Sequence, residues 1–171
     1  QQIVVDNRPS AGGVIASELL LNAPADGYTL MMVSIGHAVN ASLYSKLPYN
    51  TVKDFAGVTL IADVPNVLLT TPSLGLKTVK DLVDLVKSKP GALNYGSAGT
   101  GSSLHLTGEL FKHTTGINLV HVGYKGTSQA ITDLIAGQVH VVFSTMPPAV
   151  PMVKAGKLRA LAVTSARRAS V

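Results

Sequence analysis

The sequence predicts an α/β fold with a mostly parallel sheet, and three observations support that prediction. Apolar runs typical of strands alternate with segments of helical periodicity along the 171 residues. The connections between these runs are long enough to hold a helix each, as parallel strand pairing requires. Hydrophobic residues make up 46% of the chain, which is ample for a core. The length fits one domain or two small lobes, and no internal repeat is evident.

The first third of the chain predicts three strands and two helices. Residues 3–5 form a short apolar run, and residues 10–23 carry small and apolar side chains on one helical face. Residues 28–33 are apolar without interruption, which is typical of a strand covered on both faces. A short helix is expected at about 38–44, and a third strand at 55–62.

The middle of the chain predicts a strand at 66–71 and a helix that begins at Thr78. Asp81 follows Thr78 by three residues, which is the spacing of a capping box. The apolar residues of this helix recur at i, i+3, i+4 and i+7, and Lys89-Pro90-Gly91 ends it. They are Val79, Leu82, Val83 and Val86.

The remainder continues the alternation. A strand ends near Tyr95, a Gly- and Ser-rich loop follows, and Ser102 or Ser103 caps a helix that closes at Gly116. Thr127 or Ser128 is expected to cap the next helix. Glycine closes that helix and the short one after it, at Gly137 and Gly156, and the three remaining strands are expected at 119–122, 139–143 and 158–163.

Three loops of the second half follow strands of the predicted parallel sheet. They are 96–103, 123–128 and 144–148, and each leads into a helix start. Ligands of such sheets bind beyond the carboxyl ends of the strands, so the loops are expected to meet at one edge. Backbone N–H groups, a helix dipole and hydroxyls there favour an anion. The alternative is a set of ordinary βα turns with flexible glycines.

Individual side chains near these loops have two interpretations each. His105 lies one turn inside its helix and either faces the ligand or packs internally. Lys125 either meets a carboxylate as a point charge or is an exposed turn lysine. Ser34 and His37 follow another predicted strand and either complete a site from the first lobe or cap the next helix.

The sequence signals for nucleotide binding, serine hydrolysis and metal binding are weaker than the signal for anion binding. The loop lacks the Gly-Lys-Ser/Thr of a nucleotide triphosphate site and the third glycine of a dinucleotide fingerprint. Ser97 is not in a nucleophile elbow, so a small serine hydrolase acting through Ser97 or Ser102 is a minor alternative. His105, Glu109 and His113 have an i+4 spacing that metal ligands use, but a solvated helix face explains it better.

Amino-acid composition further limits which partners and which kinds of scaffold are plausible for this chain. The formal net charge is +5, from 14 Lys and Arg against 9 Asp and Glu, which favours anionic partners. Basic residues are scattered and aromatics are only 5%, which disfavours nucleic-acid binding. The chain has no cysteine, so a disulfide scaffold and Cys-ligated metals are excluded.

A series of segments carries a family resemblance. They are Pro24–Leu30, Leu47–Tyr49, Lys53–Phe55, Leu93–Ser97, His121–Gly126 and Gly156–Thr164. Their order, over essentially the whole chain, resembles the Bug family of substrate-binding receptors of tripartite tricarboxylate transporters, which are periplasmic proteins of Gram-negative bacteria.

The resemblance implies a two-lobed receptor of the type II periplasmic class that closes around a small organic carboxylate. It implies a membrane permease as partner and no catalysis. We also expect no metal and no cofactor. The first lobe would hold residues 1–64 and 164–171, the crossing segments 65–71 and 158–163, and the second lobe 72–157. A ligand-sensing effector domain of a transcription regulator shares this architecture and is the alternative, although no DNA-binding helix-turn-helix is present.

The resemblance and the loop positions together select the candidate ligand-binding residues. They are Ser34, His37, Ser97, Gly99, Thr100, Gly101, Ser102, Ser103, His105, Tyr124, Lys125, Gly126, Thr127, Ser144 and Thr145.

The chain departs from the family pattern in several places. Family members begin with a further strand and a Pro/Gly-rich loop, and they continue into a segment that completes the first lobe, so we expect a truncated or partial copy. Gly123 stands where Pro is common, and Ser144 stands where Asp is common. The lost acidic group implies selectivity away from amino-bearing ligands.

Overall fold

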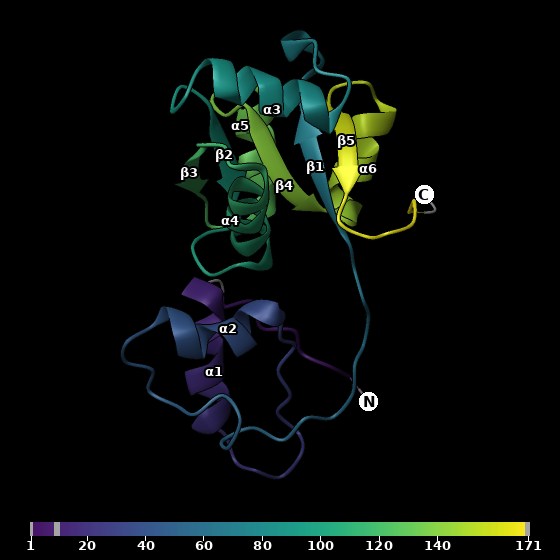
Figure 1. Cartoon of the computed structure of the whole chain (residues 1–171). Helices are drawn as coiled ribbons and strands as arrows, with labels where there is room; N and C mark the ends of the chain where they lie inside the picture. The colour runs from purple at the N-terminus through teal and green to yellow at the C-terminus, as the bar shows by residue number, and fades with distance from the viewer. Residues whose placement is uncertain (1, 9–10, 170–171) are drawn as a thin grey trace. The chain divides into compact units, whose positions relative to one another are not determined.

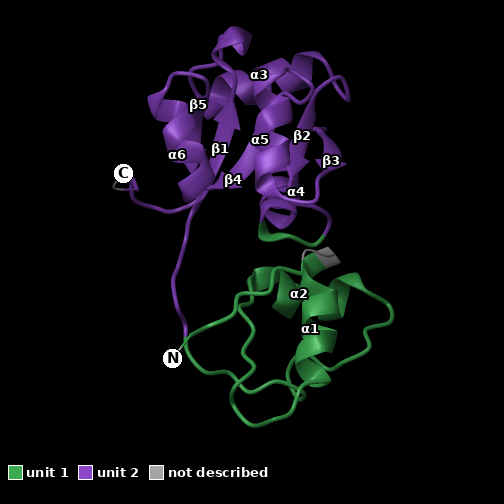
Figure 2. Cartoon of the chain, turned by 180° about the vertical axis from the view of Figure 1, so that it is seen from behind, with its two compact units in different colours: residues 1–59, 101–103 green, residues 60–100, 104–171 purple. Residues whose placement is uncertain are grey.

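The computed structural model describes residues 2–8 and 11–169 of the chain. It divides into two compact units, which Figure 2 colours separately. Unit 1 holds residues 1–59 together with 101–103, and unit 2 holds residues 60–100 and 104–171. Among the described residues, no helix combines the length and the apolar character that crossing a bilayer requires.

Unit 2 is built on a five-stranded sheet with the order β3-β2-β4-β1-β5 (Figure 1). The strand β2 pairs in parallel with β3 and β4, whereas β1 pairs antiparallel with β4 and β5. Four of the five strands therefore share one direction, which confirms the predicted mostly parallel sheet, with β1 as the exception. The strands are β1 (Asn66–Thr70), β2 (Asn94–Ser97), β3 (Val120–Gly123), β4 (Val141–Thr145) and β5 (Arg159–Val163).

Helices cover both faces of this sheet. Two of them, α3 (Val79–Ser88) and α4 (Ser103–Thr115), share one core cluster with Leu68, Tyr95 and Phe143 of the strands. The helices α5 (Thr127–Ile135) and α6 (Met146–Lys154) share the other cluster with strand residues such as Leu69 and Val142. Because neighbouring strand residues point to opposite faces, β1 supplies Leu68 to one cluster and Leu69 to the other.

The local signals for these helices are mostly confirmed. The Thr78 side chain accepts the amide proton of Asp81, and the Asp81 side chain accepts that of Thr78, so the capping box of α3 is present. The 3₁₀ turn η2 (Pro72–Leu74) precedes it. The expected cap of α5 is wrong, because the N-cap is Gly126 and it makes no side-chain cap. Thr127 is already helical there, which leaves its hydroxyl beyond the capping position.

Unit 1 contains the 3₁₀ turn η1 (Ala11–Gly13) and the helices α1 (Val14–Leu21) and α2 (Ile35–Leu43). The helix predicted over 10–23 is confirmed for its central part, and Ser10 lies outside the described residues. Its entry is irregular because Gly12 and Gly13 adopt positive φ angles of 63° and 85°.

The three strands predicted in the first third of the chain are wrong. Residues 3–5, 28–33 and 55–62 contain no strand, and Ile3, Leu30 and Val58 are 87%, 73% and 78% exposed. An apolar run becomes a strand only where neighbouring strands satisfy its backbone groups. No strand among the described residues is paired with any of these three runs.

Candidate functional site

The loops that follow β2, β3 and β4 lie at one edge of the unit 2 sheet, because these three strands run in the same direction. The first two loops are in direct contact. The amide of Tyr124 donates to the carbonyl oxygen of Ser97 at 3.0 Å. A side chain at Gly99, whose φ is +107°, would lie 3.0 Å from the Tyr124 carbonyl oxygen. The expectation that these loops share an edge is confirmed.

The backbone donors at this edge are fewer than the sequence suggested. The Gly99 amide donates to Ser97 Oγ at 3.1 Å, and the Lys125 amide donates to Gln129 Oε1 at 3.2 Å. Gly101, Ser102 and Ser103 are grouped with unit 1 and have interactions within the chain. Among the described residues, the amides of Thr100, Gly126 and Thr127 have no acceptor and remain as donors for a guest.

The two side chains of the turn after β3, Tyr124 and Lys125, differ in burial and in their partners. The Tyr124 hydroxyl donates to Asp133 Oδ2 at 2.8 Å, and burial together with this bond raises the pKa of Tyr124 to about 12. Its ring packs in the α5 and α6 cluster, so only its backbone lies at the edge. Lys125 is exposed, and no carboxylate among the described residues pairs with it. It is an exposed cation at this edge.

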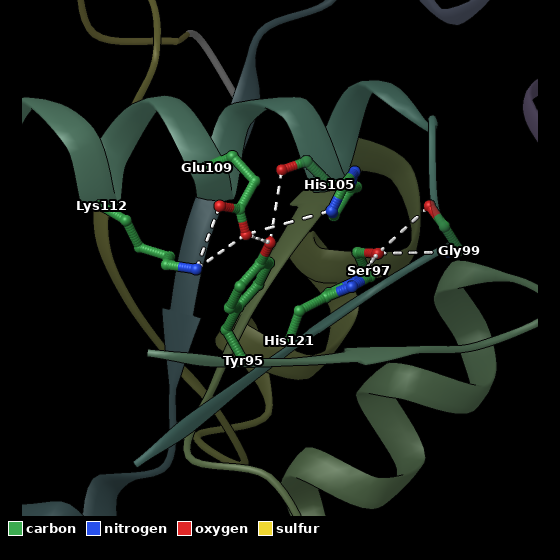
Figure 3. A network of polar contacts seen from close by, with 7 residues as sticks. All are labelled: Tyr95, Ser97, Gly99, His105, Glu109, Lys112 and His121. Carbon is green, nitrogen blue, oxygen red and sulfur yellow. Dashed lines mark hydrogen bonds and ion pairs between the residues drawn. The ribbon is translucent and has the colours of Figure 1, made fainter. Parts of the chain in front are cut away.

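Ser97 lies at the end of β2 and is fully buried. Its Oγ is 2.7 Å from His121 Nε2 and accepts the Gly99 amide proton (Figure 3). His105 projects from α4 onto the same group, and the His105 and His121 ring centroids are 4.2 Å apart. Two predicted site residues, Ser97 and His105, therefore both contact His121 under α4, a residue that was not among the predicted ones.

A charged group extends this network along α4. Tyr95 donates to Glu109 Oε1 at 2.7 Å, and Lys112 donates to both Glu109 oxygens at 2.9 and 3.0 Å. Burial acts to raise the pKa of Glu109, but the bonds from Tyr95 and Lys112 outweigh it and leave that pKa lowered. Burial and the same bond raise the pKa of Tyr95 well above its usual range. Glu109 stays ionised and fixes the helix against β2.

The remaining predicted residues of unit 2 lie at the end of β4. Ser144 is fully buried, and its hydroxyl donates to the Thr145 carbonyl oxygen at 2.8 Å. Thr145 is partly exposed and occupies the N-cap of α6 without a side-chain cap.

Ser34 and His37 lie in unit 1, at the N-cap and in the first turn of α2. The Ser34 hydroxyl accepts the Gly36 amide proton, so it caps that helix. His37 is buried between Tyr49 and Phe55, and its Nδ1 is 3.2 Å from Ser17 Oγ. Burial lowers the pKa of His37. The structure gives both side chains roles inside unit 1.

The three residues of α4 with metal-like spacing, His105, Glu109 and His113, form neither a metal site nor a uniformly solvated helix face. His105 is turned inward onto His121, Glu109 is held by Tyr95 and Lys112, and His113 is exposed. Within the described residues, no three His, Asp or Glu side chains are placed to hold a metal ion together.

Sequence reasoning missed His121 as a residue of this region. A signal was available in strand alternation, since Tyr95 and Ser97 share a face of β2, and Tyr95 is the register partner of His121. Recognising it needed the pairing of β2 with β3, which local patterns do not give.

Comparisons with known proteins agree on one family. The sequence profile of the tripartite tricarboxylate transporter family receptor matches residues 1–171. The protein BugT of Bordetella pertussis is 38% identical over 172 residues, which cover 99% of this chain and 53% of BugT.

Two solved structures are similar in fold and sequence. The R. palustris protein Rpa4515, solved with adipate, is 41% identical with a TM-score of 0.93, over 98% of this chain and 56% of that one. MatC from Rhodopseudomonas palustris, solved with bound malate, is 30% identical with a TM-score of 0.84, over 93% and 54%. The chain therefore spans about half the length of these relatives. The family is one of receptors, so the hydrolase alternative is not supported.

Proposed function

Because the chain belongs to the tripartite tricarboxylate transporter family of receptors, we propose that it binds a small organic carboxylate at the sheet edge of unit 2. The observation that carries the proposal is the contact between the loops after β2 and β3, which offer the Thr100, Gly126 and Thr127 amides beside Lys125. Backbone amides at a helix start and a neighbouring cation suit a carboxylate. Each hydrogen bond to a charged group is worth about 1.5–3 kcal/mol.

The similar structures support the ligand class. Rpa4515 was solved with adipate and MatC with malate, and both are dicarboxylates. We propose dicarboxylates as the first class to test for this chain. Three or four such bonds, less the cost of ordering and desolvation, correspond to roughly micromolar binding, or about −8 kcal/mol.

The finer proposal concerns transport. The family description supports a periplasmic receptor that passes its ligand to a membrane permease. Following the family architecture, residues 1–64 and 164–171 would belong to the first lobe and 72–157 to the second. Movement about the crossing segments 65–71 and 158–163 would then close the receptor, driven by contacts made only in the closed state.

Calorimetry with a panel of mono-, di- and tricarboxylates tests the proposal. We expect dicarboxylates to bind, and Lys125→Gln to weaken binding about fivefold to tenfold through loss of one charged contact. Lys157→Gln is the matched control, since Lys157 is an exposed turn lysine just before β5, at the opposite edge of the sheet. Silence across the panel from a folded chain, or equal losses in both variants, would contradict the proposal.

A further inference from the structure

We infer that His121 is a positioning residue for the proposed binding loop, which it holds in place through Ser97 and Gly99. The inference rests on the proposed function for its ligand and on the geometry of unit 2 for the relay itself. His121 lies on β3 beneath α4, and the loop it would control begins at the end of β2 (Figure 3).

We call the chain of contacts from His121 through Ser97 to Gly99 the relay. It consists of two hydrogen bonds that share one atom, Ser97 Oγ. Ser97 Oγ is 2.7 Å from His121 Nε2 and 3.1 Å from the Gly99 amide nitrogen. Ser97 is fully buried, so water has no access to replace either partner. Gly123 completes the packing, because a side chain there would lie 3.4 Å from His121 Cε1 and 3.6 Å from Gly99 Cα. Gly123 therefore lies in contact distance of both the imidazole and the loop backbone, with little room for a side chain.

The proton positions explain why the relay favours a neutral imidazole. With Nε2 unprotonated, the Ser97 hydroxyl donates to it while Oγ accepts the Gly99 amide proton, and both bonds are good. A protonated Nε2 must itself donate to Oγ, so the hydroxyl proton has to turn to the Gly99 carbonyl oxygen at 3.4 Å. That distance is long for a bond between two oxygens. Oγ then has to accept protons from both Nε2 and the Gly99 amide without donating its own over a short bond, so it is a poorer acceptor for Gly99. Protonation of His121 therefore weakens the bond from the Gly99 amide.

The surroundings keep His121 neutral. The Tyr95 and His105 rings lie 4.9 and 4.2 Å from its ring centroid. Burial first, and then His105, lower the pKa of His121 to about 4, with Glu109 opposing and Lys112 adding to the effect. The relay is consequently in place at the pH values where carboxylate ligands are ionised.

An NMR titration of the ligand-free full chain tests the relay. Between pH 7 and pH 3.5, we expect the Gly99 amide and the His121 ring proton to shift with one midpoint near pH 4. His121→Gln keeps a hydrogen-bonding group without a titrating one, so the Gly99 shift should become flat. His121→Phe should displace the Gly99 resonance at every pH and speed its exchange. A Gly99 amide that ignores both the titration and His121→Phe would overturn the inference, provided that the α5 amides report a folded unit.

A binding measurement with adipate tests the positioning role. We expect His121→Phe to weaken binding about fivefold to tenfold, His121→Gln to restore it largely, and Ser97→Ala with His121→Phe to cost no more than either change alone. His113→Phe, at an exposed position of α4, is the control and should bind normally. Equal affinity of His121→Phe and the wild-type chain would overturn the positioning role. If the wild-type chain binds no carboxylate, the proposed function fails, and the amide titration still decides the relay.

Discussion

Unit 1 and unit 2 contain apolar runs of the same kind, yet only unit 2 turns them into a sheet. The run at Asn66–Thr70 lies between β4 and β5 and is buried along most of its length. The run at 28–33 is just as apolar, but Leu30 is 73% exposed and its segment contains no strand. The difference teaches that strand propensity is a local property, whereas a strand is a product of its neighbours.

The difference also separates the energetics of the two units. The apolar core clusters belong to unit 2, on both faces of its sheet. The buried residues of unit 1 include a polar and aromatic set around α2: Ser17, His37, Asn40 and Tyr49. Equal substitutions in the two units should therefore have unequal effects on the free energy of unfolding.

The largest difference in the free energy of unfolding should be that between Leu82→Ala in unit 2 and Leu30→Ala in unit 1. Leu82 is 0% exposed, so its truncation leaves a cavity and should lower the free energy of unfolding by about 2–5 kcal/mol. Leu30→Ala should change it by less than about 0.5 kcal/mol. Urea denaturation followed by circular dichroism measures both, and equal losses would show that the two apolar segments are equally buried in solution.

A second contrast uses glycine. A side chain at Gly108 of α4 would collide with the Tyr95 ring, whereas nothing lies within 4 Å of the same position at Gly57 in unit 1. Gly108→Ala should cost about 1–3 kcal/mol through overpacking of α4 against β2. Gly57→Ala should be close to neutral in the same denaturation assay. A neutral Gly108→Ala would mean that α4 stands farther from Tyr95 than described.

The histidines provide a contrast in pH dependence. Burial lowers the pKa of His121 from 6.5 to about 4, so the folded chain binds fewer protons than the unfolded chain between these values. The free energy of unfolding should therefore fall as the pH drops from about 6.5 to about 4, and His121→Gln should flatten this slope. Urea denaturation at a series of pH values measures the slope, and an unaltered slope in His121→Gln would contradict the burial.

The smallest contrast concerns helix caps. Thr78→Ala removes the capping box of α3 and should lower the free energy of unfolding by about 1 kcal/mol. Ser34→Ala removes the cap of α2, whose Oγ accepts the Gly36 amide proton at 3.3 Å. Because α2 lies outside the apolar core clusters, we expect its loss to show mainly as local amide exchange. A global loss as large as that of Thr78→Ala would show that the two units unfold together.

The fold of unit 2 was largely predictable because its signals are local. The capping box at Thr78, the stripe from Val79 to Val86 and the glycine after each helix fix α3, α4 and α5 within a residue or two. The absence of strands from residues 3–5, 28–33 and 55–62 was not predictable, because strand formation depends on partner strands that no local pattern encodes.

The sheet edge at which the candidate site lies was predictable from the sequence, but the backbone amides available there were not. Strand direction put the loops after β2 and β3 at one edge, as found. Which amides remain for a guest depends on side chains such as Ser97 and Gln129, whose hydrogen bonds are tertiary contacts. The role of His121 depends on the register of β3 against β2, which the sequence does not specify.

Mapping adipate onto the backbone amides by ¹H–¹⁵N chemical-shift perturbation would test most directly whether the unit 2 edge holds a carboxylate. We predict saturable shifts at Thr100, Gly126 and Thr127, with none at the turn 155–158 before β5. Saturable shifts confined to that turn, or no shifts at any adipate concentration, would contradict it.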